Sequence, residues 1–436
     1  MRTYQEFYRT YGEALGRVEQ PSRYVGGEFG RVQAKDAKFT IALCFPDLYE
    51  VGMSNNAIKL LYSLLNDIEG VRCERVFAVA PDFERELRER GLPLYSLETY
   101  TPLQDFDLIG FSVGYELLAS NMLQVLELGG LAIRSTDRRG RHAPIVIAGG
   151  PALSNPHPFA RFVDGVFLGE AEAVLPELIR MMSGVADQSV ETGRVFPQPN
   201  VSTPPSYSAV QDQRRELLEE CPHVWTPGSQ ASRAVWPEFG QAAHKPVFPV
   251  PSMRVAQDHA VVEIMRGCPQ GCRFCHAGVY YRPYRMKDYA AVEEEVSHLV
   301  HDLGYNEVTL SSLSSGDYYG IDVLLQRLNE RFRTHGVSFQ LPSLRVSSFT
   351  LPLLEQLSSL RRGGLTFAVE AGAVETQQAM NKLVPIDRTI EILRAAKSRG
   401  WQVAKFYFMI GLPGAPDDEA GSIIEYVKEV RRAVKL

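Results

Sequence analysis

The chain of 436 residues contains few cysteines, no long apolar run and no excess of positive charge. Because no uninterrupted apolar stretch of about 18 residues occurs, and because the first residues, MRTYQE, lack the apolar core of a signal peptide, we expect neither a membrane-spanning helix nor a membrane partner. The net charge of −6 argues against a broad electrostatic surface for nucleic acid, although a local basic groove, and with it a nucleic-acid substrate, stays open. Six cysteines are too few for a disulfide framework in so long a chain, which predicts a reduced, cytoplasmic protein.

Three of the six cysteines are clustered in one short segment, RGCPQGCRFC, at residues 266–275. Their spacing, C-x3-C-x2-C, suits three corners of an iron–sulfur cube whose fourth iron stays open to a substrate or cofactor, and the two glycines let the backbone wrap closely around the metal. A structural zinc site is the alternative, but it needs four ligands, and His276 is poorly placed to complete the tetrahedron beside its neighbour. The predicted metal ligands are Cys268, Cys272 and Cys275.

Residues 37–183 alternate between strand-forming and helical patterns, which predicts a parallel sheet covered by helices on both faces, a Rossmann-like domain. Residues 1–36 are polar, with four aromatic residues at helical spacing between positions 4 and 11, which predicts a helical extension that packs on its own domain. The expected strands of the domain are 39–45, 71–80, 107–113, 144–148 and 163–168, and the expected helices are 56–65, 82–90, 116–132 and 170–182.

The periodicity fades over residues 184–254, where ten of the 27 prolines fall between Pro197 and Pro251. This composition predicts an irregular connector that wraps over the domains, with a partly disordered linker as the alternative. Regular alternation resumes in residues 255–436, where a run of β/α units predicts all or part of a barrel. The expected strands of this half are 260–265, 307–313, 338–341, 365–370 and 402–410, and the expected helices are 290–303, 321–334, 351–360, 386–399 and 418–433.

Polar or small residues follow nearly every strand of the second half, at the carboxyl ends where α/β barrels place their chemistry. Serines after the second strand can bind a polar head group, and Arg345 after the third can pair with a carboxylate in bidentate fashion. Glu370 can accept hydrogen bonds from vicinal hydroxyls, and Gly411 and Gly414 permit close backbone approach to a flat ring. Each of these residues alone is weak evidence for a binding site. Together, and in this order after the cysteines, they are strong evidence for one.

These residues resemble the radical S-adenosylmethionine (radical SAM) superfamily over about residues 258–436, with Phe274 in the aromatic slot of the motif C-x3-C-x-φ-C. The resemblance implies a [4Fe–4S] cluster on the three cysteines, whose unique iron chelates S-adenosylmethionine. One electron from a donor such as flavodoxin or ferredoxin would then release a 5′-deoxyadenosyl radical. The contacts implied for S-adenosylmethionine are Phe274, Ser312, Ser314, Arg345, Glu370 (to the ribose), Gly411 and Gly414 (to the adenine).

Two features depart from the common radical SAM pattern. Ser312, Ser314 and Ser315 stand where a Gly-Gly-Glu motif usually binds the methionine amine, which puts the amine contacts in doubt. The sequence also stops after a fifth strand and its helix. Either the chain is a truncated form of the barrel or something else closes the edge.

In the first half, the segment 47–52, DLYEVG, stands where cobalamin-binding Rossmann-like domains carry D-x-H-x-x-G. Asp47 and Gly52 match, but Tyr49 occupies the position of the histidine that is the lower axial cobalt ligand. Small residues at later strand ends suit close approach of a corrin, with ordinary βα turn chemistry as the alternative. The cobalamin contacts implied are Asp47, Tyr49, Gly52, Ser112, Gly149 and Gly150.

The arrangement therefore resembles the B12-binding radical SAM proteins, within a subfamily of unassigned substrate. The fold class expected is α/β, with an N-terminal Rossmann-like domain of the cobalamin-binding type followed by a partial (β/α) radical SAM barrel. The Tyr49 substitution implies base-off cobalamin with no histidine on its lower face. A vestigial domain that has lost the corrin is the alternative.

The resemblance implies radical methylation of an unactivated carbon or phosphorus, with cobalamin supplying the methyl group. A cobalamin-dependent rearrangement and a non-catalytic iron–sulfur or cobalamin redox sensor are the alternatives. Radical methylthiotransfer is disfavoured, because it needs three further N-terminal cysteines and the remaining ones, Cys44, Cys73 and Cys221, are scattered. The sequence assigns no catalytic base, no substrate and no oligomeric state.

Overall fold

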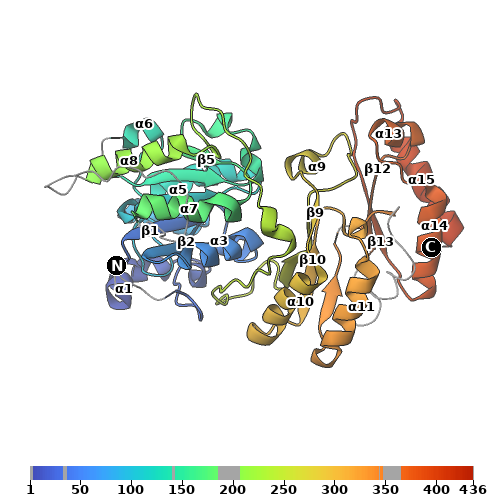
Figure 1. Ribbon diagram of the computed structural model, residues 1–436, viewed down its shortest axis with the longest axis horizontal. Coiled ribbons are helices and arrows are strands. Elements are labelled where there is room, and N and C mark those ends of the chain that lie inside the picture. The colour runs from blue at the N-terminus through green and yellow to red at the C-terminus, as the bar shows by residue number, and fades with distance from the viewer. Residues whose placement is uncertain are drawn as a thin grey trace. The chain divides into compact units, whose positions relative to one another are not determined.

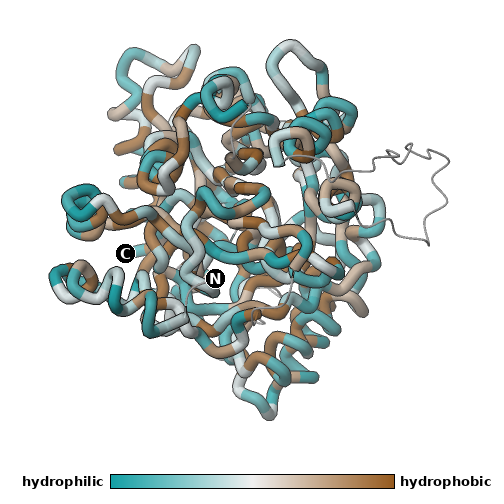
Figure 2. The backbone as a smooth tube through the Cα atoms, turned by 90° about the vertical axis from the view of Figure 1, so that its left-hand side faces the viewer, coloured by the Kyte–Doolittle hydropathy of each residue, from teal (hydrophilic) through white to brown (hydrophobic). Residues whose placement is uncertain are grey.

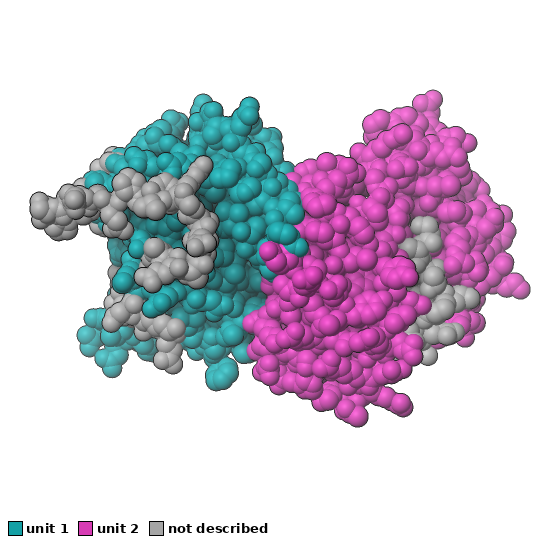
Figure 3. All heavy atoms as spheres, in the orientation of Figure 1, with its two compact units in different colours: residues 1–237, 246–258 teal, residues 238–245, 259–436 magenta. Residues whose placement is uncertain are grey.

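The computed structural model describes residues 3–32, 37–139, 143–184, 207–342, 344–346 and 365–435. The chain divides into two compact units, residues 1–237 with 246–258 and residues 238–245 with 259–436 (Figure 3). The segment that connects the two βα-rich halves therefore contributes to both units. Residues 238–245 belong to the second unit, and residues 246–258 belong to the first. Each unit has its own hydrophobic core.

The first unit is built on a six-stranded sheet in the order β2-β1-β3-β4-β5-β6 (Figure 1). All pairs are parallel except β5 with β6, which are antiparallel. Successive residues of β1 are buried whichever face they point to, so helices cover both faces of the sheet. The strands are β1 (Phe39–Phe45), β2 (Val71–Phe77), β3 (Leu108–Ser112), β4 (Ile145–Gly149), β5 (Gly165–Phe167) and β6 (Val224–Trp225).

The helices of the first unit confirm the expected βα alternation. Helix α3 packs against α7, and α4 packs against α1 and α5. As predicted, α1 packs on its own unit: Phe7 and Tyr11 are buried while Tyr4 and Tyr8 face solvent. The helices are α1 (Tyr4–Leu15), α2 (Tyr49–Gly52), α3 (Asn56–Asn66), α4 (Pro81–Arg90), α5 (Ala119–Leu128), α6 (Ser135–Arg138), α7 (Ala171–Ser183) and α8 (Tyr207–Glu220).

The prediction of an irregular connector over 184–254 was wrong for residues 207–225, which form α8 and β6 and complete the first sheet. The pattern was missed because the buried face of α8 is mostly polar. Arg214 lies 2.9 Å from Asp107 and Arg215 lies 3.3 Å from Asp164, so ion pairs replace the apolar stripe that marks a helix in sequence. The linker alternative for residues 185–206 lies outside the described residues.

The second unit contains β/α units in two parallel pieces. Strands β7, β10 and β11 pair in the order β11-β10-β7, and β12 pairs with β13. A short antiparallel ribbon, β8 with β9, closes the base of the cysteine loop. The strands are β7 (Ala260–Glu263), β8 (Met265–Arg266), β9 (Arg285–Met286), β10 (Glu307–Ser311), β11 (Ser338–Gln340), β12 (Leu365–Glu370) and β13 (Ala404–Phe408).

The helices of this unit also follow the prediction, with two additions among the described residues, the short helices α9 and α13. The helix expected over 351–360 lies outside the described residues. Helix α10 continues as a π-helical turn, His298–Asp302. The helices are α9 (His276–Tyr280), α10 (Tyr289–Ser297), α11 (Ile321–Phe332), α13 (Val374–Ala379), α14 (Ile386–Ser398) and α15 (Glu419–Val434).

Single 3-10 turns complete the described backbone: Pro21–Arg23, Leu103–Asp105, Glu116–Leu118, Pro151–Ser154, His157–Phe159, Pro237–Gly240, Ser315–Asp317 and Arg333–His335. Apolar residues gather on the strands and on one side of each amphipathic helix (Figure 2). Within the described residues, no helix has the length and apolar character needed to cross a membrane.

The strands of the second unit present one apolar and one polar face. Val308 and Leu310 of β10 are fully buried in the hydrophobic core with the helices. Thr309 and Ser311 alternate with them and point to the opposite face, as β geometry requires. The polar face and the carboxyl ends of these strands are where a β/α architecture places its chemistry.

Candidate functional site

The cysteine loop is held at its base by the β8–β9 ribbon, where Arg266 pairs with Arg285. Gly267 begins the loop with φ +78°, and a Cβ there would lie 2.7 Å from the Tyr281 carbonyl oxygen. Only glycine fits this close approach to the backbone of the β9 side of the loop, and the predicted wrapping around a metal stays a prediction. The loop therefore leaves the ribbon in a fixed direction.

Each of the three sulfurs has an N–H donor, which for Cys268 is the backbone amide of Gln270. The Gly278 amide donates to Cys275 Sγ at 3.3 Å, and Arg345 Nη1 donates to Cys272 Sγ at 3.3 Å. Burial raises the pKa of the Cys268 thiol, although the hydrogen bond from the Gln270 amide and the positive charge of Arg345 act in the opposite direction. Metal binding would have to offset that cost at Cys268.

The three cysteines do not converge on one point in this structure. Among the described residues, no three His, Cys, Asp or Glu side chains converge as the ligands of one metal ion do. A zinc ion needs its thiolates about 2.3 Å from one point, so these cysteines as placed do not form a zinc site. The thiolates of a cube bind three different irons, and hydrogen bonds to the sulfurs are part of its environment.

A second segment, the end of α13 and the residues after it, is hydrogen-bonded to the cysteine loop. The Arg273 amide donates to the Met380 carbonyl at 3.0 Å, and Asn381 Nδ2 donates to the Gly271 carbonyl at 3.0 Å. Asn381 has φ +56°, a conformation that asparagine tolerates better than most residues. No periodic pattern in the sequence indicates this contact.

Glu370 lies at the end of β12 in an unusual conformation. Its φ is +71°, and the register between β12 and β13 shifts between Ala368 and Glu370. Its carboxylate accepts a hydrogen bond from Lys382 Nζ at 2.7 Å, and the same ammonium lies 5.9 Å from the centroid of the Phe274 ring. Lys382, which sequence reasoning missed, thus links two predicted site residues.

The serines after β10 lead into the turn Ser315–Asp317. This turn contacts the cysteine loop, because Gln270 Nε2 donates to both carboxylate oxygens of Asp317 at 2.8 and 2.9 Å. Ser312 Oγ and Ser315 Oγ are 2.8 Å apart. Ser314 Oγ is fully buried and has no hydrogen-bond partner among the described residues. A buried hydroxyl without a partner is the kind of group that a bound ligand satisfies.

Gly411 and Gly414 follow β13 in left-handed conformations, with φ +82° and +75°. No described atom lies within 4 Å of a Cβ built at either position. The Gly411 amide donates to Glu419 Oε2 at 2.7 Å. The backbone here is open, as the prediction of a flat ring requires, and the ring contact itself stays a prediction.

In the first unit the structure contradicts the prediction that Tyr49 contacts cobalamin. Tyr49 is 1% exposed, its hydroxyl donates to Glu28 Oε1 at 3.1 Å, and it accepts from the Ser252 amide at 3.1 Å. Gly52 serves packing, since a Cβ there would lie 2.1 Å from the Phe77 ring. The position was misread because the groups that bury Tyr49 come from distant parts of the chain.

Tyr49 belongs to a buried charged network that sequence reasoning also missed. Arg75, with no exposed side-chain surface, pairs with Glu28 at 3.0 Å and with Glu98 at 2.6 Å. Burial raises the pKa of the Glu98 carboxyl. The network ties β2 to two loops and to the returning segment 246–258.

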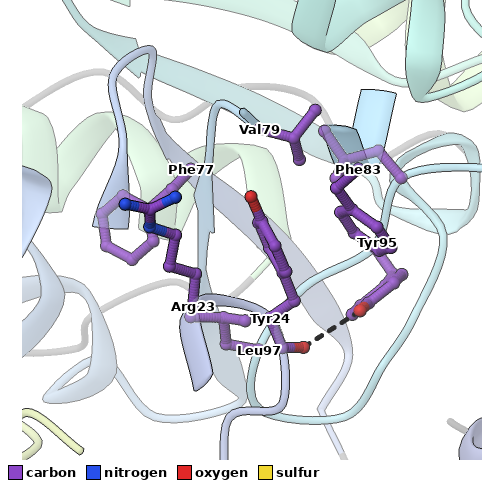
Figure 4. A pocket seen from close by; sticks show the side chains of 8 residues that line it. Arg23, Tyr24, Phe77, Val79, Phe83, Tyr95 and Leu97 are labelled. Atoms are coloured by element: carbon purple, nitrogen blue, oxygen red, sulfur yellow. Dashed lines mark hydrogen bonds between the residues drawn. The ribbon is translucent and has the colours of Figure 1, made fainter. Parts of the chain in front are cut away.

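A small cavity opens beside this network (Figure 4). It measures about 10 Å³, which is roughly the space of one water molecule. The Tyr95 hydroxyl donates to the Tyr24 carbonyl at 3.0 Å. The cavity is too small for a cofactor; its lining residues are Arg23, Tyr24, Phe77, Val79, Phe83, Leu94, Tyr95 and Leu97.

The carboxyl ends of β3 and β4 carry the remaining predicted residues. Ser112 pairs with Gly149 in the sheet, and Gly110 lies on the same face two residues earlier. All three are partly exposed in the middle of the sheet, and a Cβ at Gly110 would meet no described atom within 4 Å. Gly150 serves the turn, since its φ is +118° and a Cβ would lie 2.4 Å from the Val113 carbonyl oxygen. We call the open strip over Gly110, Ser112 and Gly149 the β3–β4 slot.

Comparison with known families agrees with this architecture. Residues 262–427 match the family model of the radical SAM superfamily, and residues 57–198 match that of the N-terminal domain of radical SAM proteins. The chain therefore carries regions that match both the N-terminal and the core domain of radical SAM proteins. The model matched by the first half is not described as a cobalamin-binding domain.

Two solved structures share the fold over most of the chain. The radical SAM methyltransferase TsrM from Kitasatospora setae, with tryptophan and a SAM analogue, is 14% identical with a TM-score of 0.61, covering 90% of this chain and 71% of that one. The cobalamin-dependent enzyme OxsB, with aqua-cobalamin and S-adenosylmethionine, is 14% identical with a TM-score of 0.55, covering 89% and 51%. At this identity the likeness shows the α/β fold with its parallel sheet.

Among sequence relatives, the uncharacterized protein MJ0966 of Methanocaldococcus jannaschii is 24% identical over 404 residues, 91% of this chain and 74% of that protein. A ribosomal protein uS12 methylthiotransferase of Thermoanaerobacter sp. is 25% identical over 181 residues. That match covers 40% of this chain and 41% of the relative.

Proposed function

We propose that this protein is a cobalamin-dependent radical SAM methyltransferase that acts on an unactivated carbon or phosphorus centre. The observation that carries the cobalamin assignment is the β3–β4 slot, which leaves the face of a central strand open where an ordinary doubly wound sheet is covered. Small residues in register on adjacent strands allow a flat or extended group to approach the backbone. A vestigial domain would have no need to keep this strip open.

The residues of the second unit support the radical part of the proposal. Cys268, Cys272 and Cys275 would hold the cluster, which when bound supplies the electron that cleaves S-adenosylmethionine. Lys382 would fix the orientation of the Glu370 carboxylate through their hydrogen bond. Ser314 would offer its unsatisfied hydroxyl to the ligand.

The test is anaerobic reconstitution with iron, sulfide and hydroxocobalamin, followed by desalting and metal counting. About four irons and one cobalt per chain are the expected result, because a [4Fe–4S] cluster contains four irons and cobalamin one cobalt. Gly110→Leu fills the slot and should abolish cobalt retention with iron unchanged. Gly110→Ala is the matched control, since its methyl group fits the open space. Iron without cobalt in the unmodified protein would refute the cobalamin assignment.

Methyl transfer is separated from rearrangement by the fate of S-adenosylmethionine. A methyltransferase converts part of it to S-adenosylhomocysteine, whereas a rearrangement yields 5′-deoxyadenosine alone. The loaded protein, incubated with reductant and S-adenosylmethionine, should form both products. Formation of neither product would favour a sensor.

A further inference from the structure

The loops that follow β1 and β3 are tied together across the edge of the first sheet. The Tyr115 hydroxyl donates to Asp47 Oδ2 at 2.5 Å, and the Leu48 amide donates to Asp47 Oδ1 at 2.7 Å. A second tie runs from Asn121 Nδ2 to the Pro46 carbonyl at 3.0 Å. The Asp47 carboxylate is therefore fixed at both oxygens, and one of its partners is an aromatic side chain from another strand end.

This pair lies at the topological switch point of the sheet. In the order β2-β1-β3-β4-β5, the chain leaves β1 toward β2 on one side and later returns to place β3 on the other. Ligands of open α/β sheets bind outside the carboxyl ends of the strands at such a point. Asp47 follows β1 and Tyr115 follows β3, so the pair lies where a ligand would enter.

Tyr115 is accessible where Tyr49 is not. Its exposed fraction is 41%, against 1% for Tyr49. The residue before it, Gly114, has no described atom within 4 Å of a Cβ position. The open backbone at Gly114 joins Tyr115 to the β3–β4 slot, because Ser112 is only two residues earlier.

We propose that Tyr115, held by Asp47, is the side chain that this protein presents to the lower face of cobalamin, in place of the histidine of D-x-H-x-x-G. This inference rests on the proposed binding of cobalamin. A carboxylate that accepts the proton of a neighbouring side chain fixes the orientation of that side chain toward a metal. Here the carboxylate is the Asp of the motif, and the oriented group is a phenol from β3.

The chemistry of the pair also fits a weakly ligated cobalt. The hydrogen bond to the Asp47 carboxylate raises the pKa of Tyr115 to about 12. The phenol is therefore neutral at physiological pH, and a neutral phenol that already donates its proton is a poor donor to a metal. The lower face would be shielded by Tyr115 without a strong bond.

The test replaces the phenol by a ligand that can be seen. In Tyr115→His the imidazole can donate one N–H to Asp47 and offer its other nitrogen to cobalt. We expect nitrogen hyperfine splitting in the electron paramagnetic resonance spectrum of the bound Co(II) state, which the unmodified protein lacks. Tyr49→His is the matched control and should show no splitting, because position 49 is buried. Cobalt bound by the Tyr115→His variant without splitting, or splitting in the Tyr49→His variant, would overturn the assignment.

A second variant covers the case in which Tyr115→His does not fold. Tyr115→Ala removes only an exposed ring, and added imidazole should then reach the cobalt and produce the same splitting, while the unmodified protein should not respond. No response of the Ala variant would also overturn the assignment. Failure of the proposed function is distinct, because the unmodified protein would then retain no cobalt at all.

Discussion

Lys382 is the residue whose removal should weaken S-adenosylmethionine binding most selectively. Its ammonium lies 2.7 Å from Glu370 and close to the Phe274 ring, and both partners are predicted contacts of the ligand. Lys382→Met keeps the apolar stem and removes a charged hydrogen bond worth about 1.5–3 kcal/mol. We expect the dissociation constant for S-adenosylmethionine, measured by equilibrium dialysis on the reconstituted protein, to rise about tenfold or more, with iron content unchanged.

Lys382→Arg preserves the charge and serves as the control for that measurement. Its affinity should stay within about threefold of the unmodified protein, since an exchanged cation keeps the ion pair. Unchanged or tighter binding in Lys382→Met would show that the lysine competes with the ribose for Glu370. The role assigned to Lys382 would then be wrong.

Arg345 should tune the cluster through its hydrogen bond to Cys272. The guanidinium donates to the ligand sulfur at 3.3 Å and stabilises the more negative, reduced cluster. Arg345→Gln should lower the reduction potential by an amount on the order of 60 mV, the one-electron equivalent of about 1.4 kcal/mol. A redox titration followed by electron paramagnetic resonance measures this shift. Arg345→Lys should shift it less, and equal shifts in both variants would point to packing in place of charge.

At the scale of elements, helix α2 connects the first strand to the rest of the first unit. Tyr49 contacts Glu28 and Ser252, Glu50 pairs with Arg23 at 2.7 Å, and the Ala256 amide donates to the Glu50 carbonyl at 3.1 Å. A helix of four residues has little stability of its own, so these contacts hold it. The segment that resembles a cobalamin motif is therefore mainly a structural junction.

Tyr49→Phe tests this role. Removing the hydroxyl deletes one hydrogen bond to Glu28, which keeps its ion pair with Arg75, and one from the Ser252 amide. A lost hydrogen bond of this kind costs about 0.5–1.5 kcal/mol. We expect the free energy of unfolding of the first unit, measured in urea, to fall by that amount while cobalt content stays constant. Tyr8→Phe, at a position that is 62% exposed, should change neither quantity. Loss of cobalt at unchanged stability would mean that Tyr49 does contact the cofactor.

The helices and strands show which parts of the secondary structure could be predicted from the sequence. The bounds of β1 and β12 match the prediction to the residue, because each segment is mostly apolar and rich in strand-forming residues. Helix α8 was missed because Arg214 and Arg215 are buried through ion pairs, and α13 because its sequence, VETQQA, has no apolar stripe. Hydrophobic periodicity in the sequence indicates helices that bury apolar side chains. It does not indicate helices that bury charged side chains.

The candidate site also contains residues that could be predicted from the sequence and residues that could not. The cysteine triplet and the strand-end residues could be predicted from the sequence because spacing and chain order point to them, and their roles stay predictions. Asn381 was missed because its role depends on a contact with a segment more than 100 residues away in the sequence. Lys382 was missed because its position depends on a turn that follows a polar helix. Tyr49 was assigned by analogy, and only the tertiary contact with Ser252, 203 residues away, shows that it is buried.

At the scale of the whole molecule, the two units have hydrophobic cores that share no residue. A chain with two such cores does not have to unfold in one step. Each proposed cofactor also has its residues in one unit: the cysteines lie in the second, and the β3–β4 slot and the Asp47–Tyr115 pair in the first. Binding should therefore stabilise one unit at a time.

Calorimetry of the anaerobic protein with each cofactor added separately measures this. A ligand present at about 100 times its dissociation constant stabilises the folded state that binds it by about 2.7 kcal/mol, which for a unit of this size corresponds to roughly 5–10 °C in the midpoint. We expect hydroxocobalamin to raise one transition and cluster reconstitution to raise the other. Gly110→Leu should remove the first effect and keep the second. If both transitions moved together with either cofactor, the two units would have to fold as one, and the assignment of each cofactor to one unit would lose its basis.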